Sequence, residues 1–501
     1  MSILIRNASV LTLDQEDRFL ETSDILIDGD RIAAIGDDLV RTEAGATERV
    51  IDGTGLLAMP GLINGHFHSA SAFMKGAFDG FPLEVYMLRE TPSDDLASGQ
   101  RAGYLRTMLS ALELIKLGVT SVRDDQHFFL PAADDTIDVT LQAYADAGIR
   151  ASVGIADPNL PEYATLPFLQ DMLPQSAIKA MDARSCKSTA DMVAMYDRAF
   201  ARWHNHDGGR LAIHVSCSAP QRVTRETMKA LAALAQEHDV AFDMHILETK
   251  MQYVHGREDH GQSLIAYVDD IGALNENSVV IHAVWADDDD IVRMANAGAM
   301  VAHNPVSNLA LGSGVMSLRK MIDAGVPVCL GTDEASVDES NNLWINAKVG
   351  TMLQRIDQPD YDQWPAAETY LNCIMDGGAR ALRKHGELGQ LREGALADII
   401  LLDLDRMPFV PLNNLKRQLV TAETGSSVVM TMVAGRVICE NGRVLTVDEA
   451  AIKDEIRAMW PRYRALCDAF NRERAELETI THGIYDRCAQ SDIGFTRWIG
   501  G

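Results

Sequence analysis

The sequence predicts a (β/α)8 barrel that is joined to a small β domain and followed by a helical extension. Between residues 58 and 332, eight short apolar runs alternate with Ala- and Leu-rich helical stretches, a pattern typical of a closed parallel barrel. Short β-type runs stand both before and after that region. Residues suited to metal binding fall where predicted strands end, and a barrel gathers those ends on one face.

The two ends of the chain have a similar β-type texture. Residues 1–58 hold short apolar runs separated by Gly- and Asp-containing turns, and comparable runs return only at 397–446. The two ends can share a sheet only if the chain leaves, builds another domain and comes back. We therefore expect one composite β-sandwich domain, made of residues 1–58 and 393–448.

The middle of the chain, residues 59–392, alternates strand and helix. Helical stretches such as 101–117 and 223–237 separate the apolar runs. The predicted strands are 58–64, 119–123, 149–154, 211–217, 240–245, 279–282, 299–303 and 327–332. Residues 449–501 predict a helix from Asp454 to Arg474 and an irregular tail, a C-terminal helical extension that we expect to serve packing or subunit contact.

Composition limits the partners and the compartment. A chain of 501 residues has room for a barrel and an accessory domain. The net charge of −27 disfavours nucleic acid and anionic lipid as partners. Seven scattered cysteines indicate free thiols in a reducing compartment. The apolar runs are too short for a signal peptide or a membrane span, so we expect a cytoplasmic protein with no membrane partner.

Metal-type residues stand at the ends of separate predicted strands. They are His66, His68, His245, His282 and Asp333, with Glu248 three residues after His245. Residues i and i+2 of a strand point to the same side, so His66 and His68 can face one ion. Imidazoles and a carboxylate suit Zn²⁺ and leave a position for water. A second His-x-His pair, His204 and His206, lies in a polar loop and is expected on the surface.

Several motifs resemble those of a known superfamily. Residues 59–68 (MPGLINGHFH) resemble the first-strand motif of the amidohydrolase superfamily, in the branch of S-adenosylhomocysteine deaminases, guanine deaminases and triazine chlorohydrolases. Further motifs of that branch follow in the same order at 244–249 (MHILET), 280–283 (VIHA), 303–309 (HNPVSNL) and 330–333 (LGTD). The similarity covers roughly residues 1–450 and includes 394–401 (GALADIIL) in the accessory domain.

The resemblance assigns roles to these residues. It implies that the ligands of the metal are His66, His68, His245 and Asp333. It also implies that Glu248 is the proton shuttle and that His282 stands beside the bound water. Two-metal members commonly need a bridging carbamylated lysine on the fourth strand, and residues 211–220 contain neither Lys nor Glu. We therefore expect one Zn²⁺ per subunit, with Fe²⁺ as the alternative.

The resemblance further implies a hydrolytic deaminase. Such an enzyme replaces an exocyclic amino group of an N-heterocycle (triazine, purine, pterin or pyrimidine) by hydroxyl, with Glu248 moving the proton while His282 and Asp333 orient the nucleophile. Three alternatives stay open: a hydrolase that expels chloride or an alkylamine from the same site, an amide or urea hydrolase, and an inactive scaffold. Relatives are usually dimers or tetramers, so a homo-oligomer is expected.

Residues near the strand ends bear on the choice of substrate. Deaminases of the branch usually carry His-Ala-Pro after the fourth strand, whereas this chain has Ser218 in place of that His, which favours a compact heterocycle. Glu334 follows Asp333 and would favour a substrate with an exocyclic amino group or a cationic edge, unless it faces away. His127 is expected to line the pocket or to act from behind it. His303 is expected to contact the ligand or to brace loops.

A long loop, residues 69–98, follows the first strand and carries several large apolar or aromatic side chains. This loop, with Phe73, Met74, Phe78, Phe81 and Tyr86, is a candidate lid over the site. The alternative is that its aromatic residues only pack on the barrel.

Overall fold

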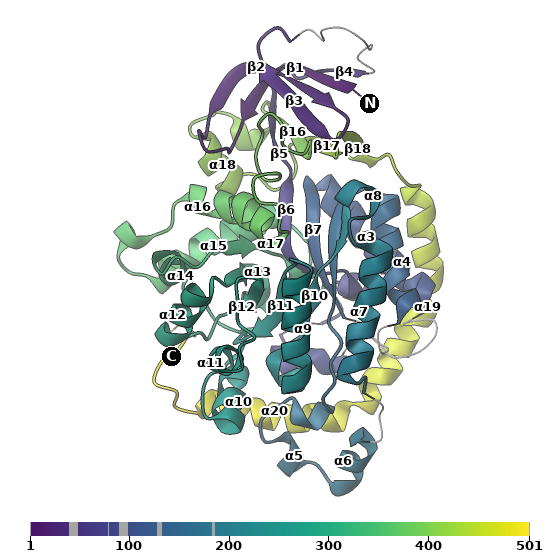
Figure 1. Cartoon of the computed structure of the whole chain (residues 1–501), viewed down its shortest axis with the longest axis vertical. Coiled ribbons are helices and arrows are strands. Elements are labelled where there is room, and N and C mark those ends of the chain that lie inside the picture. Colours follow the sequence, from purple (N-terminus) through teal and green to yellow (C-terminus); the bar gives the residue numbers. More distant parts are fainter. Residues whose placement is uncertain are drawn as a thin grey trace.

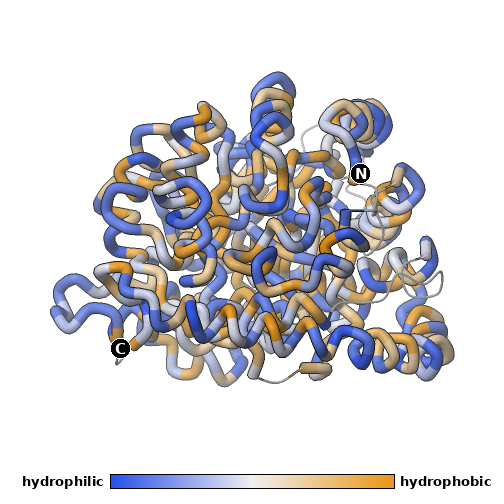
Figure 2. The backbone as a smooth tube through the Cα atoms, turned by 90° about the horizontal axis from the view of Figure 1, so that it is seen from below, coloured by the Kyte–Doolittle hydropathy of each residue, from blue (hydrophilic) through white to orange (hydrophobic). Residues whose placement is uncertain are grey.

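The computed structural model describes residues 2–39, 49–78, 80–89, 99–127, 133–182 and 186–499. Residues 90–98 of the predicted lid and Phe128 and Phe129, which follow His127, lie outside these ranges. Figure 1 shows a barrel with a small β domain at its top and two long helices along its side and base. Orange apolar segments gather in the middle of the barrel when it is seen from below (Figure 2).

The barrel is built from two five-stranded parallel sheets, β15-β6-β7-β8-β9 and β10-β11-β12-β13-β14. Their bounds are β6 (Leu62–His68), β7 (Val119–Gln126), β8 (Arg150–Ile155), β9 (Leu211–Ile213), β10 (Val215–Ser216), β11 (Phe242–Ile246), β12 (Ser278–His282), β13 (Met300–His303), β14 (Val328–Leu330) and β15 (Asp333–Glu334). Each predicted strand position contains a strand, and the predicted barrel is confirmed. The fourth strand is interrupted at His214 and the eighth at Gly331–Thr332.

Helices surround this barrel. They include α3 (Gln100–Lys116), α4 (Asp134–Ala147), α7 (Thr189–Trp203), α9 (Arg225–Glu237), α10 (Lys250–His260), α11 (Leu264–Asp270), α12 (Asp288–Ala297), α13 (Pro305–Ala310), α14 (Leu318–Asp323), α15 (Leu343–Asp357), α16 (Ala367–Asn372) and α17 (Gly378–Ala381). Side chains of Ser188, Thr224 and Thr249 accept backbone N–H groups at the starts of α7, α9 and α10, which fixes where these helices begin.

Shorter helices occupy the connections on either face of the barrel. They include η1 (Ser69–Met74), α1 (Leu83–Tyr86), η2 (Met87–Arg89), η3 (Glu162–Ala164), α5 (Leu169–Met172), α6 (Gln175–Asp182), α8 (His206–Gly209) and η4 (Pro220–Arg222). A further short helix, α18 (Leu415–Thr421), connects β16 to β17 of the terminal domain.

The β domain joins both ends of the chain in a nine-stranded sheet. Its strands are β1 (Ser2–Leu11), β2 (Phe19–Asp28), β3 (Arg31–Gly36), β4 (Arg49–Asp52), β5 (Leu56–Pro60), β16 (Ile399–Asp403), β17 (Val428–Val433), β18 (Arg436–Glu440) and β19 (Arg443–Val444). β5 pairs in parallel with β1 and antiparallel with β16, so strands from opposite ends of the sequence are direct neighbours. The sheet covers its own apolar core, which includes Ile3, Ile25 and Leu401.

The predicted first barrel strand, 58–64, proves to be parts of two strands that meet at Gly61. β5 ends at Pro60 in the terminal sheet, and β6 starts at Leu62 in the barrel. A side chain at position 61 would lie 2.1 Å from Cγ2 of Thr120, so only glycine fits where the chain crosses between the two domains.

The C-terminal extension is more helical than the sequence indicated. α19 (Glu449–Glu473) is followed directly by α20 (Ala475–Gln490), where an irregular tail was expected. α19 runs along the side of the barrel and α20 crosses its base (Figure 1). Glu478 of α20 accepts from Arg89 of η2 at 2.8 Å, and the indole of Trp498 donates to the Gly312 carbonyl at 2.9 Å. The extension therefore packs on the face of its own barrel where the strands end.

Among the described residues, no helix combines the length and apolar character that crossing a bilayer would require. All seven cysteines are free thiols.

Candidate active site

The predicted metal-type residues meet at the carboxyl ends of the barrel strands. One ligand atom each from His66, His245, His282 and Asp333 lies within 4.8 Å of the other three. His68 joins them, because its Nε2 is 3.2 Å from Asp333 Oδ1 and 3.2 Å from His245 Nε2. We call these five residues the central cluster.

Distances within the central cluster do not distinguish the four expected metal ligands from His282, which was expected only to stand beside the bound water. His66 Nε2 is 3.3 Å from Asp333 Oδ1, and His282 Nε2 is 3.8 Å from Asp333 Oδ2. His282, expected beside the water, thus approaches Asp333 nearly as closely as the expected ligands. The division of roles among the four imidazoles remains a prediction.

Unusual backbone conformations aim these side chains inward. Ser218, Leu247, His282 and Asp333 have positive φ values of 63°, 54°, 73° and 64°. Non-glycine residues in this region each cost roughly 1–2 kcal/mol, and such strain concentrates at functional sites. Gly331 allows the last strand to pass β6 closely, since a Cβ there would lie 2.6 Å from the His66 carbonyl oxygen.

Hydrogen bonds on the outer ring nitrogens fix the orientation of the histidines. Nδ1 of His68 is 2.5 Å from the carbonyl oxygen of Asp125, and Nδ1 of His245 is 2.8 Å from that of Ser218. Nδ1 of His282 is 2.9 Å from Oδ1 of Asn308. A backbone carbonyl oxygen can only accept, so Nδ1 of His68 and Nδ1 of His245 each carry a proton, and Nε2 of both rings faces the cluster.

The electrostatics of the central cluster favour a positive charge at its centre. Burial lowers the pKa of His66 to about 4. Burial acts on His68 in the same direction, but the hydrogen bond and charge of Asp333 outweigh it and raise the pKa of His68 to about 10. Burial opposes ionisation of Asp333, yet the imidazoles of His66 and His68, whose Nε2 atoms lie 3.3 Å and 3.2 Å from its Oδ1, hold its pKa well below the usual range.

The donor atoms also suit a cation. Within the described part of the chain, Nε2 of His66 and Nε2 of His282 are buried and lack a hydrogen-bond partner. Unpartnered imidazole nitrogens grouped with one carboxylate are the ligands that Zn²⁺ takes in catalytic sites.

Glu248 lies beside the cluster as a buried acid. Its backbone N–H donates to Oε1 of Gln252 at 2.9 Å, which holds the residue in place after β11. Its Oε2 is 3.5 Å from Nε2 of His282, and its Oε1 has no hydrogen-bond partner among the described residues. Burial, followed by the charges of Asp333 and Glu84, raises the pKa of Glu248 well above its ordinary value. A carboxyl group with this property can hold a proton near neutral pH.

A cavity of about 420 Å³ opens onto the cluster, and His68, His245, His282, Asp333 and Glu248 lie on its wall. His127, Ser218 and Glu334, three of the four predicted substrate-binding residues, line it as well. The fourth, His303, is buried and is not among the lining residues. Burial lowers the pKa of His303 to about 3.

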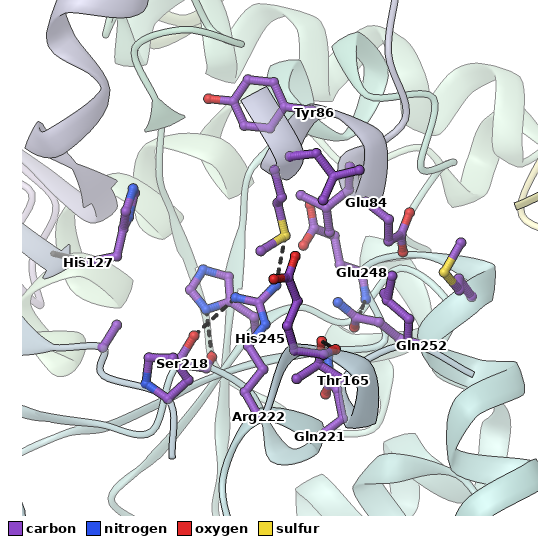
Figure 3. A pocket seen from close by; sticks show the side chains of 18 of the residues that line it. Glu84, Tyr86, His127, Thr165, Ser218, Gln221, Arg222, His245, Glu248 and Gln252 are labelled. Carbon is purple, nitrogen blue, oxygen red and sulfur yellow. Dashed lines mark hydrogen bonds between the residues drawn. The ribbon is translucent and has the colours of Figure 1, made fainter. Parts of the chain in front are cut away.

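Further cavity residues were not predicted from the sequence. Figure 3 shows Glu84, Arg222 and Gln252 around the same space as His245 and Glu248. Arg474, between the two C-terminal helices, also reaches the wall. These residues come from loops and from the extension, where no motif or periodic pattern marks them. The one sequence feature that could have pointed to them is a charged residue in a short segment after a strand end, as at Arg222.

The second His-x-His pair lies elsewhere and is only partly exposed, contrary to the expectation of a surface pair. His206 is exposed, whereas His204 is half-buried and its Nδ1 accepts from the N–H of Ile213 at 3.3 Å. The short strand β9 begins directly after this loop and holds His204 in place.

Comparison with known proteins agrees with this geometry. Residues 57–438 match the sequence model of the amidohydrolase family. A 5-methylthioadenosine/S-adenosylhomocysteine deaminase of Desulforudis audaxviator is 30% identical over 90% of this chain and 96% of that protein. A 5'-deoxyadenosine deaminase of Methanosphaera stadtmanae is 27% identical over 89% of this chain and 96% of that protein.

Among solved structures, a variant of atrazine chlorohydrolase TrzN from Arthrobacter aurescens TC1, in complex with zinc and atraton, superposes with a TM-score of 0.81. It is 26% identical, and the match covers 91% of this chain and 99% of that chain. The family model matches most of the chain, and the residues at the strand ends lie around one point. The chain therefore belongs to the amidohydrolase family.

Proposed function

We propose that this protein is a hydrolytic deaminase that uses one Zn²⁺ to replace an exocyclic amino group of an N-heterocycle by hydroxyl. The observation that carries the proposal is the central cluster, with the buried acid Glu248 beside it, on the wall of a 420 Å³ cavity. Deaminase relatives that align over most of the chain support the reaction type.

The metal would be held by His66, His68, His245 and Asp333. A bound Zn²⁺ supplies a Lewis acid beside which a water molecule loses its proton near neutral pH. His282, close to both Asp333 and Glu248, orients the oxygen nucleophile.

Glu248 moves the proton. Its carboxylate takes a proton from water and delivers it to a ring nitrogen, and the oxygen adds to the amino-bearing carbon. Glu248 then takes the second proton, from the added oxygen, and passes it to the amino group as the carbon–nitrogen bond breaks. Water and the amino-heterocycle thus become the hydroxy-heterocycle and ammonia. Gln252 fixes the backbone of Glu248 during both transfers.

Release of chloride or an alkylamine is the second candidate. Ser218 in place of the usual His and the superposition on an atrazine chlorohydrolase favour it. Ammonia, amine and chloride are measured over a panel of heterocycles with the metal-loaded protein. Ammonia release supports deamination, and chloride release without ammonia replaces it with the second candidate.

Replacing Glu248 by Gln tests the proton route. We expect Glu248→Gln to keep the fold and the metal while kcat falls about 10²–10⁴-fold, the usual contribution of general acid–base catalysis. Glu258, exposed on α10, provides the matched control, and Glu258→Gln should retain full activity. Near-normal turnover by Glu248→Gln would show that this proton route is wrong.

Metal analysis tests the ion. We expect about one zinc per chain, and stoichiometric iron would replace zinc in the proposal. We also propose a cytoplasmic homodimer or homotetramer, and sedimentation of the purified protein measures the assembly.

A further inference from the structure

Arg222 occupies a fixed position on the cavity wall. It ends η4, the turn that follows the fourth barrel strand. Its N–H donates to the Ala219 carbonyl at 3.0 Å, and its own carbonyl accepts from Asn159 at 3.0 Å and from Leu160 at 3.1 Å. These three backbone bonds anchor the side chain, which Figure 3 shows beside His245 and Ser218.

The guanidinium group of Arg222 has only neutral partners. Nη1 donates to Oγ of Ser218 at 3.0 Å, and Nη2 donates to Sδ of Met87 at 2.8 Å. Among the described residues, no carboxylate lies within 4.0 Å of its nitrogens. These two bonds use two of the five N–H donors of a guanidinium, so further donors are available to a molecule in the cavity.

Several arginines in the described part of the chain are paired with acids. Arg123 contacts Asp243, Arg150 binds Asp398 at 2.9 Å, and Arg474 on the same cavity wall pairs with Glu162. Oxygen acceptors that carry negative charge are the strongest partners of a guanidinium group. Arg222 is half-buried on the cavity wall, where a substrate could supply such an acceptor.

The surroundings of Arg222 indicate what such a molecule carries at its other end. Glu84 and Glu334 line the same cavity as Arg222. Oε2 of Glu84 is buried without a hydrogen-bond partner in the described part of the chain. The cavity thus offers donors on one part of its wall and acceptors on another, which suits a ring with both an oxygen and N–H groups.

We propose that Arg222 binds a negatively polarised oxygen on the substrate, and that this oxygen is a ring carbonyl. The preferred substrate is then an oxo-substituted amino-heterocycle rather than an adenine-type base. This inference rests on the proposed deaminase function and names its substrate class. Ser218 contributes by its small size, because it leaves room for the arginine and accepts one of its hydrogen bonds. A carboxylate on a substituent offers similar chemistry and is the alternative source of the oxygen.

The test compares the wild type with Arg222→Gln and Arg222→Lys in the metal-loaded protein. Three substrates are used: an amino-oxopurine, an aminopurine without oxygen, and an aminopurine with a carboxylate side arm. We expect Arg222→Gln to lower kcat/KM for the oxo compound about 10- to 150-fold, mainly through KM, as for loss of a charged hydrogen bond. The compound without oxygen should change less than threefold, and Arg222→Lys should recover part of the loss.

Arg225→Gln is the control, since Arg225 is exposed and three residues further along the chain. Equal losses on all three substrates, or no loss on any, overturn the inference. A loss confined to the side-arm compound overturns the ring carbonyl and assigns the oxygen to a substituent. Calorimetry of the oxo compound with metal-loaded wild type and Arg222→Gln separates this result from a failure of the deaminase proposal, because it measures binding without turnover.

Discussion

Two groups of buried Asp and His side chains lie inside this barrel, and they differ in how their charge is balanced. The central cluster includes His66, His245, His282 and Asp333, and the second group, here the inner cluster, comprises Asp125, His214 and Asp243. In each of these two sets, the possible ligand atoms lie within 4.8 Å of one another. Members of the central cluster border the cavity, whereas none of the inner cluster lines it.

The inner cluster contains its own cation. Arg123 is fully buried, donates to the Gly65 carbonyl at 3.0 Å and contacts Asp243, which also lies 3.2 Å from Nε2 of His214. Burial opposes ionisation of Asp243, but Arg123 and His214 outweigh it and lower its pKa to about 2. A similar set of donors can thus be an internal ion pair or a cation site. The deciding features are the counter-charge and access to the cavity.

The largest effect should come from removing one histidine of each cluster. We expect His245→Ala to lose the metal and to reduce kcat/KM by about 10³-fold or more, since the ion contributes several kcal/mol to catalysis. His214→Ala should retain the metal, because its ring faces Asp243 rather than the cavity. Elemental analysis and steady-state kinetics measure both. Metal loss in His214→Ala, with metal retained in His245→Ala, would reverse the distinction between the clusters.

Removing the cation of the inner cluster should have the next largest effect, on stability. Arg123→Met leaves buried carboxylates without their partner, and the free energy of unfolding should fall by about 3–5 kcal/mol. The double variant with Asp243→Asn should recover part of this loss, because the unpaired charge is gone. Denaturant unfolding measures the change, with the exposed Arg225→Met as control. A loss under about 1 kcal/mol would mean that the pair does not neutralise the inner cluster.

Asp290 is a third kind of buried carboxyl group, and its titration should have the smallest of the three effects, a change in the free energy of unfolding with pH. Asp290, near the start of α12, forms no ion pair with an arginine among the described residues, and burial raises its pKa to about 7. The folded protein keeps this proton up to about pH 7, whereas the unfolded chain releases it near pH 4. Its stabilising contribution to the free energy of unfolding is therefore complete below about pH 4 and is lost as pH rises to about 7.

The slope of that loss is on the order of 1 kcal/mol per pH unit. Asp290→Asn removes the ionisation, so the stability difference between wild type and variant should shift in favour of the variant as pH rises from 5 to 7.5. Thermal unfolding at several pH values measures it. A difference that does not vary with pH would show that Asp290 does not titrate in this range.

The barrel and the family were predictable because their signals are local. Apolar runs mark strands, and the motif around His66 and His68 is continuous in the sequence. The family and the barrel are confirmed. The domain boundaries and the roles of the site residues stay predictions. The gathering of His245, His282 and Asp333 follows from one rule, that strand ends of a barrel meet on one face.

The features that were missed depend on contacts between distant segments. The division at Gly61 follows from crowding by Thr120, on the neighbouring strand β7. α20 is helical as it packs on α1 and α10, although its sequence shows only a weak apolar face. The inner cluster left one trace, which is a run of three charged residues, 123–125, at the end of the predicted strand 119–123. Arg222 has no such signal in the sequence, because a single arginine after a strand does not indicate a binding site until the cavity around it is known.

The contacts of the C-terminal extension set the order in which the site can be completed during synthesis. Arg474 contributes to the cavity wall, and the Trp498 indole ties the segment after α20 to the loop after α13. When the last residue of the central cluster has left the ribosome, the C-terminal extension that completes the cavity wall has not yet been synthesised. We therefore expect the metal-binding residues to be present in the growing chain well before the cavity wall that contacts the substrate is complete.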